Sequence, residues 1–175
     1  MEALPLKQQK TLLYLAQSGV IAALYVALTV LLQPIGFGAV QCRVSEMLTI
    51  LPIYTPAAVP GLAVGCFLSN LIGLSSGLNP AGAWDLLFGT AATLSAALFT
   101  RGLRNVRWLK LPLAATLPPV IINAVVVGTE LFVMYGGFPL YLHMLFVGLG
   151  QVVSCTIGGS LLALTMEKSG LSRRL

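Results

Sequence analysis

Long apolar runs separated by short polar segments fill most of this 175-residue chain, and they constrain its fold more than any other feature. A helix needs about 20 mainly apolar residues to cross the hydrocarbon core of a bilayer. Hydrophobic residues make up 57% of the sequence and charged residues only 9%, whereas a soluble domain has about 25% charged residues. The sequence therefore predicts an all-α, multi-pass membrane protein. It excludes a two-domain soluble enzyme, a nucleic-acid-binding module and a secreted disulfide scaffold.

Six membrane-spanning segments are expected, within one integral membrane domain that covers residues 1–175. Proline and glycine residues, which break helices, separate several of these segments. The second segment is short for a span, so it is either a tilted helix that its neighbours shield or a half-helix. The six segments are residues 11–32, 45–54, 57–74, 83–100, 113–135 and 139–166.

Basic residues gather in three polar segments that flank the apolar runs, and Arg43 is the one basic residue outside them. Lysine and arginine in short loops mark the cytoplasmic side of a membrane protein. Six crossings also return the chain to its starting side, so we expect the N-terminus, the C-terminus and the loop at 101–110 to be cytoplasmic. The clusters are Lys7 and Lys10; Arg101, Arg104, Arg107 and Lys110; and Lys168, Arg173 and Arg174.

Four charged residues away from the basic clusters and the chain ends fall at a similar depth in the outer third of the predicted bundle. Ionisable side chains inside a bilayer are costly and usually face a cavity or a partner. Two interpretations are open: a ligand pocket with apolar walls and a few polar groups, or polar residues at the water interface. The charged residues are Arg43, Glu46, Asp85 and Glu130, and the polar or aromatic residues at the same depth are Asn70, Trp84, Tyr141 and His143.

The charge of this set indicates the kind of ligand that a pocket would take. Three carboxylates and one arginine leave a formal excess of two negative charges, and unpaired buried carboxylates protonate or seek a cation or strong donors. The set suits a small ligand that is rich in N–H donors or carries an amine and stacks on an aromatic such as Trp84. It does not suit a phosphate or a carboxylate substrate. Arg43 and Glu46 are three residues apart and can pair if their helix begins early.

Three further polar residues have two interpretations each. Asn123 shares a helix face with Glu130 and lies about 10 Å deeper, where it is either the pocket floor or an interhelical hydrogen-bonding group. His143 is either an interfacial histidine or a ligand contact, and Gln151 either joins helices or contacts the ligand. We interpret Cys66 and Cys155 as small apolar residues of helix interfaces. No metal site and no cofactor are expected.

Other motifs bear on energy coupling, on catalysis and on partners. No lysine follows a glycine, so the GxxxxGK phosphate loop is absent and ATP-driven transport would need a separate ATPase. Residues 73–77 match G-x-S-x-G, but that motif holds a nucleophile only on a strand-to-helix turn. An intramembrane serine hydrolase that uses Ser75 or Ser76 with His143 is therefore the least favoured alternative. Small residues recur four apart at Ala23 and Ala27, and again at 61 and 65; this spacing lets helices approach closely, either within the protein or against a partner.

Five motifs are spread along nearly the whole chain: VQCRVSE at 40–46, LP at 51–52, TPAAVPG at 55–61, DLLFGTAATL at 85–94 and PPVIINA at 118–124. They resemble motifs of the queuosine-precursor transporter (QueT) family of substrate-binding S components of energy-coupling factor (ECF) transporters. Cys42 stands where the resemblance implies an aromatic residue.

The resemblance implies a six-helix S component in a prokaryotic cell membrane that binds a 7-deazaguanine, such as queuine or its aminomethyl precursor, near the outer face. It implies docking through the face of Ala23 and Ala27 onto a transmembrane coupling subunit (T) and two cytoplasmic ATPase subunits that hydrolyse the ATP. An alternative is an S component or a stand-alone transporter for another amine-bearing solute or a vitamin. The implied roles are acceptors for Glu46, Asp85 and Glu130, stacking for Trp84, a loop clamp or carbonyl donor for Arg43, and support for Asn70 and Asn123.

Overall fold

The computed structural model describes residues 5–32, 42–77, 79, 81–108 and 111–173, and in this part of the chain it is helical without a strand. Some of the residues discussed above lie outside the described ones. They are Lys110, Arg174 and residues 33–41, which include Val40-Gln41 of the first family motif.

Within the described ranges, five helical segments are long and apolar enough to cross a membrane. The first predicted span begins earlier than expected, because no residue after Pro5 interrupts the helix and Lys7 and Lys10 extend it by more than a turn. The last span is continuous from Leu140 to Lys168 but winds more loosely at its centre, as a π-helical stretch. The segments are α1 (Leu6–Leu31), α3 (Ala58–Ser75), α4 (Trp84–Gly102), α5 (Leu113–Tyr135), and α6 (Leu140–Gln151) followed by η2 (Val152–Gly158) and α7 (Gly159–Lys168).

The remaining predicted segment, residues 45–54, forms a ten-residue 3₁₀ helix, η1 (Val44–Ile53). At about 2.0 Å of rise per residue this helix is about 20 Å long, whereas the hydrocarbon core of a bilayer is about 30 Å thick. Eight of its ten residues are buried. The structure therefore agrees with the expected shielding by neighbours, and a helix of this length fits both the tilted helix and the half-helix that the sequence allows.

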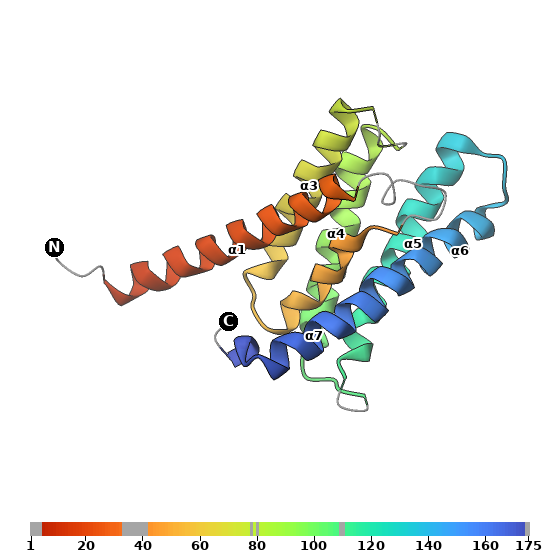
Figure 1. The fold of residues 1–175 in the computed structure, drawn as a ribbon. Helices are drawn as coiled ribbons and strands as arrows, with labels where there is room; N and C mark the ends of the chain where they lie inside the picture. Colours follow the sequence, from red (N-terminus) through yellow and green to blue (C-terminus); the bar gives the residue numbers. More distant parts are fainter. Residues whose placement is uncertain (1–4, 33–41, 78, 80, 109–110, 174–175) are drawn as a thin grey trace.

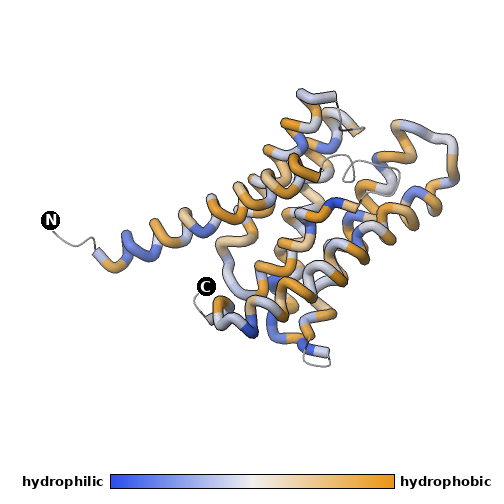
Figure 2. Tube along the Cα trace, in the orientation of Figure 1, coloured by the Kyte–Doolittle hydropathy of each residue, from blue (hydrophilic) through white to orange (hydrophobic). Residues whose placement is uncertain are grey.

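The long helices surround η1, which lies in the middle of the bundle (Figure 1). Contacts to η1 come from α1, α3, α4, α5, η2 and α7. The turns α3–α4 and α5–α6 lie at one end of the bundle, which we call the upper end after the view in Figure 1. The turn from η1 to α3, the α4–α5 loop and the C-terminus lie at the opposite, lower end. Figure 2 shows apolar residues along the helices and hydrophilic ones mainly near the helix ends and turns.

Glycine allows α1 and α3 to cross in close contact. A Cβ atom on Gly61 would lie 2.8 Å from the carbonyl oxygen of Ser18, and one on Gly65 would lie 2.8 Å from the Cβ of Tyr25. The spacing of these two glycines therefore serves packing inside the protein. Ala23 and Ala27, in contrast, are exposed on α1 and remain available to a partner.

Replacing Gly65 with alanine is expected to lower the free energy of unfolding by about 1–3 kcal/mol, because the new methyl group would collide with Tyr25 and with the backbone of Ala22. Unfolding of the detergent-solubilised chain in sodium dodecyl sulfate measures this change. The control is Gly19→Ala on α1, where a Cβ meets no atom within 4 Å. Both variants gain the helix propensity of alanine, so equal stabilities of the two would contradict the close α1–α3 contact.

Candidate functional site

Arg43 joins two long helices at the upper end of η1. It precedes η1 in an extended conformation, with φ −86° and ψ 99°, and its side chain is buried. Its Nη2 lies 2.9 Å from Asp85 Oδ2 of α4, and its Nη1 donates to Asn70 Oδ1 of α3 at 3.1 Å. The sequence allowed a pairing with Glu46 if the helix begins early. Among the described residues the ion pair of Arg43 is with Asp85 instead, although the Glu46 N–H donates to the Arg43 carbonyl at 2.9 Å in the first turn of η1.

Asp85 is held from several directions. Asn79, in the α3–α4 turn, donates from Nδ2 to Asp85 Oδ2 at 3.0 Å, and Asn70 donates to the backbone carbonyl of Asp85 at 2.8 Å. The other carboxylate oxygen, Oδ1, packs against Gly89, where a Cβ atom would lie 1.9 Å from it. Gly89 thus leaves the space that the buried carboxylate occupies, one turn along its own helix.

Glu46 is the second buried carboxylate, and neutral donors surround it. The hydroxyl of Tyr25 on α1 donates to Glu46 Oε1, and Thr93 on α4 lies 3.5 Å from the same oxygen. Oε2 has no hydrogen-bond partner among the described residues. Thr93 also lies 3.3 Å from the sulfur of Cys66, which is a buried free thiol at a helix interface, as the sequence predicts.

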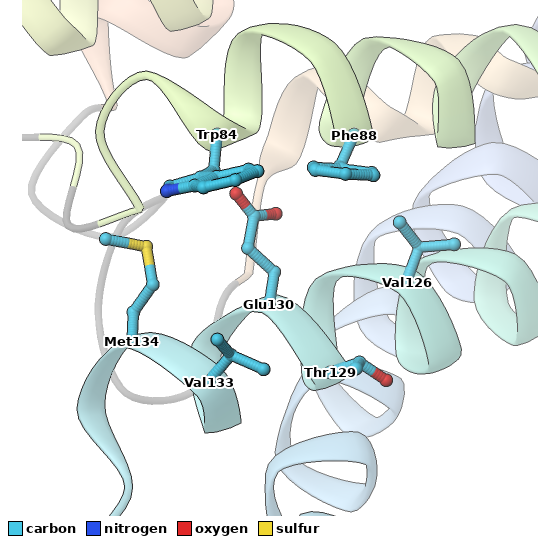
Figure 3. A pocket seen from close by; sticks show the side chains of 7 residues that line it. All are labelled: Trp84, Phe88, Val126, Thr129, Glu130, Val133 and Met134. Carbon is cyan, nitrogen blue, oxygen red and sulfur yellow. The ribbon is translucent and has the colours of Figure 1, made fainter.

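Glu130 differs from both of these carboxylates. It is buried on α5, and neither of its carboxylate oxygens has a hydrogen-bond partner in the part of the chain that the structure describes. Figure 3 shows its carboxylate pointing from α5 toward the rings of Trp84 and Phe88 on α4. The two rings are stacked, with centroids 5.6 Å apart and an interplanar angle of 21°.

A crevice of about 240 Å³ separates α4 from α5 at this point. Apart from Glu130 and Thr129 its lining is apolar, and Val126, Val133 and Met134 of α5 face the two rings (Figure 3). A carboxylate that lacks a partner in apolar surroundings is costly. A ligand that brings a cation or N–H donors would satisfy it, and the ring faces attract cations and flat rings.

Trp84 and Asp85 link the crevice to the cluster around Arg43, because they are neighbours in the first turn of α4. Trp84 is 57% exposed and lines the crevice, whereas Asp85 is 1% exposed and pairs with Arg43. The structure thus gathers Arg43, Asn70 and Asp85 in one cluster and Trp84 with Glu130 in another beside it.

Three of the expected polar residues lie apart from these two clusters. Asn123 is buried on α5 and does not line the crevice. His143 contacts the carbonyl of Gly136 through Nε2 at 3.0 Å, which places it at the α5–α6 turn. Gln151 accepts a hydrogen bond from Cys155 Sγ at 3.0 Å, one turn along its own helix. The geometry of His143 and Gln151 agrees with structural roles.

Five residues that shape the site were not among those predicted from the sequence. Phe88 follows Trp84 by four residues, a spacing that places two side chains on one helix face and would have revealed it. Asn79 lies in a segment rich in serine, glycine and proline between two apolar runs, a composition that predicts only a loop. Tyr25, Gly89 and Thr93 contact the buried polar residues only because the helices pack together, and no sequence pattern indicates those contacts.

The serines of the G-x-S-x-G segment hydrogen-bond to their own helix. Ser75 donates to the carbonyl of Ile72 at 2.8 Å, and Ser76 donates to that of Gly73 at 3.1 Å. His143 hydrogen-bonds at the α5–α6 turn instead, and among the described residues no hydrogen bond joins it to either serine. Among the described residues, no group of three or more histidine, cysteine or acidic side chains could hold a metal ion.

Removing the Asp85 carboxylate is expected to destabilise the fold strongly. Asp85→Ala leaves the buried Arg43 guanidinium without its counter-ion, which costs about 3–5 kcal/mol of unfolding free energy. The matched control is Glu167→Ala, which removes the partner of Arg107 from an ion pair whose side chains are about a third exposed and so costs about 1 kcal/mol or less. Unfolding titrations of both variants measure the difference. Similar losses in the two variants would contradict a buried ion pair at Asp85.

The model of the QueT transporter family matches residues 15–168, which is most of the chain. The matched region runs from α1 to the end of α7, and it includes η1 and every residue of the two clusters. No curated protein and no solved structure matches the chain.

Proposed function

The chain belongs to the QueT transporter family, and we propose that it is the substrate-binding S component of an ECF-type importer for a queuosine precursor. The observation that carries this proposal is the buried Glu130 carboxylate, which has no partner among the described residues and faces the rings of Trp84 and Phe88. A 7-deazaguanine has a flat ring that can stack and N–H donors that a carboxylate can accept. Its aminomethyl derivative adds a cationic amine.

In this proposal Glu130 accepts hydrogen bonds from the ligand. The rings of Trp84 and Phe88 stack on the ring of the ligand. Glu46 and Asp85 are further acceptors, and each has one carboxylate oxygen without a partner among the described residues. Through its contacts with α3 and α4, Arg43 holds the upper end of η1 in place. Asn70 supports Arg43 and Asp85, and Asn123 supports Glu130 from a deeper position on the same helix.

The proposal places the whole chain in one membrane domain with six crossings, of which η1 is the shortest. The lower end of the bundle is assigned to the cytoplasm of a prokaryotic cell. Basic residues support this orientation, because Arg101, Arg104 and Arg107 lie at the α4–α5 end and Lys168 ends α7. The crevice of Glu130 then lies toward the outer face, where a substrate arrives.

Energy coupling is assigned to partners. The sequence has no GxxxxGK phosphate loop, so ATP hydrolysis belongs to two ATPase subunits that act through a transmembrane coupling subunit. The exposed alanines Ala23 and Ala27 on α1 are the proposed docking surface, since small side chains let a partner helix approach closely. The same crevice would also suit another amine-bearing solute or a vitamin, which is the alternative to a deazapurine.

Replacing Glu130 with glutamine is expected to weaken binding of the aminomethyl deazaguanine about 10- to 100-fold, which corresponds to the loss of one charged hydrogen bond. Titration calorimetry of the purified chain measures the dissociation constants, with queuine, guanine and a panel of vitamins beside it. The matched control is Glu167→Gln, which removes a carboxylate charge at the lower end of the bundle. Tight binding of a vitamin with no binding of a deazapurine would contradict the substrate, and equal affinities of wild type and Glu130→Gln would contradict the site.

Replacing both Ala23 and Ala27 with leucine is expected to abolish assembly with the coupling subunit while leaving substrate affinity within about twofold of wild type, because both positions lie on the outside of α1. Co-purification with the coupling subunit and the ATPases measures assembly. Ala91→Leu, at an exposed alanine of α4, is the control. Normal assembly of the double variant would contradict the docking surface.

A further inference from the structure

A second, wider groove runs between α4 and α5 near the lower end of the bundle, and we propose that it binds an anionic phospholipid. The groove has a volume of about 640 Å³, and its lining is apolar throughout. Leu98 and Phe99 form its α4 wall, Leu117 and Ile121 form its α5 wall, and Gly102 and Leu103 close its lower end. It is separate from the crevice of Glu130, which lies at the upper end between the same two helices.

Gly102 leaves space in the groove, and a buried hydrogen bond joins its two helices. Gly102 has no side chain, and a Cβ atom there would meet nothing within 4 Å. Pro119 has no N–H to give to the carbonyl of Ala115 four residues earlier. The hydroxyl of Thr100 on α4 donates to that carbonyl at 2.9 Å instead. The two helices are thus joined on one side of the groove, while its other side stays open.

Charge at the lower end of the groove is positive. The α4–α5 loop carries Arg101, Arg104 and Arg107, and residues 101–108 contain no acidic residue. Arg101 donates to the carbonyl of Pro52 at 2.7 Å, and Arg107 pairs with Glu167 at 2.7 Å. Arg104 is exposed, and its side chain makes no hydrogen bond or ion pair within the described ranges.

An occupant must therefore be apolar along the groove and negative at the loop. Leu103 lines the groove, and the exposed Arg104 follows it directly in the chain, so a cationic residue lies next in sequence to the apolar lining. Trp108 is 68% exposed in the same loop, and tryptophan and arginine gather at the level of lipid headgroups. Basic pockets between membrane helices bind anionic headgroups. An anionic phospholipid has this chemistry, with its acyl chain on α4 and α5 and its phosphate on Arg104.

Native mass spectrometry of the full chain, released from nanodiscs that contain equal amounts of phosphatidylglycerol and phosphatidylcholine with identical acyl chains, tests this site. The wild-type chain is expected to retain phosphatidylglycerol in preference to phosphatidylcholine. Arg104→Gln is expected to reduce that retention about fivefold, the effect of one basic residue near an anionic lipid surface. Gly102→Phe fills the groove without changing any charge and is expected to abolish the retention.

Two control variants keep the groove and the arginine intact. Lys10→Gln removes an exposed charge from the start of α1, and Gly19→Phe adds the same ring at another glycine with open space around it. Both are expected to retain the lipid as the wild type does. Equal retention of the two lipids, retention by Gly102→Phe, or equal losses in the controls would each overturn the proposal.

Discussion

The shortness of η1 is the constraint on which the rest of the bundle depends. At about 20 Å it is shorter than a hydrocarbon core of about 30 Å, so the backbone groups at its ends lie at membrane depth and must be covered by protein rather than by lipid. The surrounding helices provide this cover, and arginines fix both ends: Arg43 pairs with Asp85 at the upper end, and Arg101 donates to the Pro52 carbonyl near the lower end. The packing that shields η1 therefore also brings Glu46 and Arg43 into the interior beside α4.

The three interior carboxylates are stabilised to very different degrees. Asp85 has a guanidinium and two asparagines, and Glu46 has the hydroxyls of Tyr25 and Thr93. Glu130 has no partner among the described residues and faces an apolar crevice with two stacked rings. Because an unpaired carboxylate in a bilayer is costly, its presence is best explained by a ligand that supplies the missing donors. In the proposed function Glu130 is therefore the main acceptor for the ligand, whereas Asp85 and Glu46 offer one carboxylate oxygen each and also hold the bundle together through their other contacts.

Much of this arrangement could be predicted from the sequence. The glycine and proline residues that flank the apolar runs predicted the observed bounds of α5, and those of α3 to within one residue. The scarcity of charge within the apolar runs pointed to Glu46, Asp85 and Glu130, which the structure shows as buried carboxylates. The partner of Arg43 could not be predicted, because Asp85 is 42 residues away and only the packing of η1 against α4 brings them together. The 3₁₀ geometry of η1 and the contact of Tyr25 with Glu46 depend on the same packing. Depth alone does not say which way a side chain points, so the sequence left His143 with two interpretations.

A structure of the chain with bound 7-aminomethyl-7-deazaguanine tests the central claim most directly. We expect the ligand between α4 and α5, with its ring on Trp84 or Phe88 and its amine about 2.8 Å from a carboxylate oxygen of Glu130, the length of a charged hydrogen bond. A ligand bound elsewhere in the bundle, with Glu130 still without a partner, would contradict the assignment of this crevice as the substrate site.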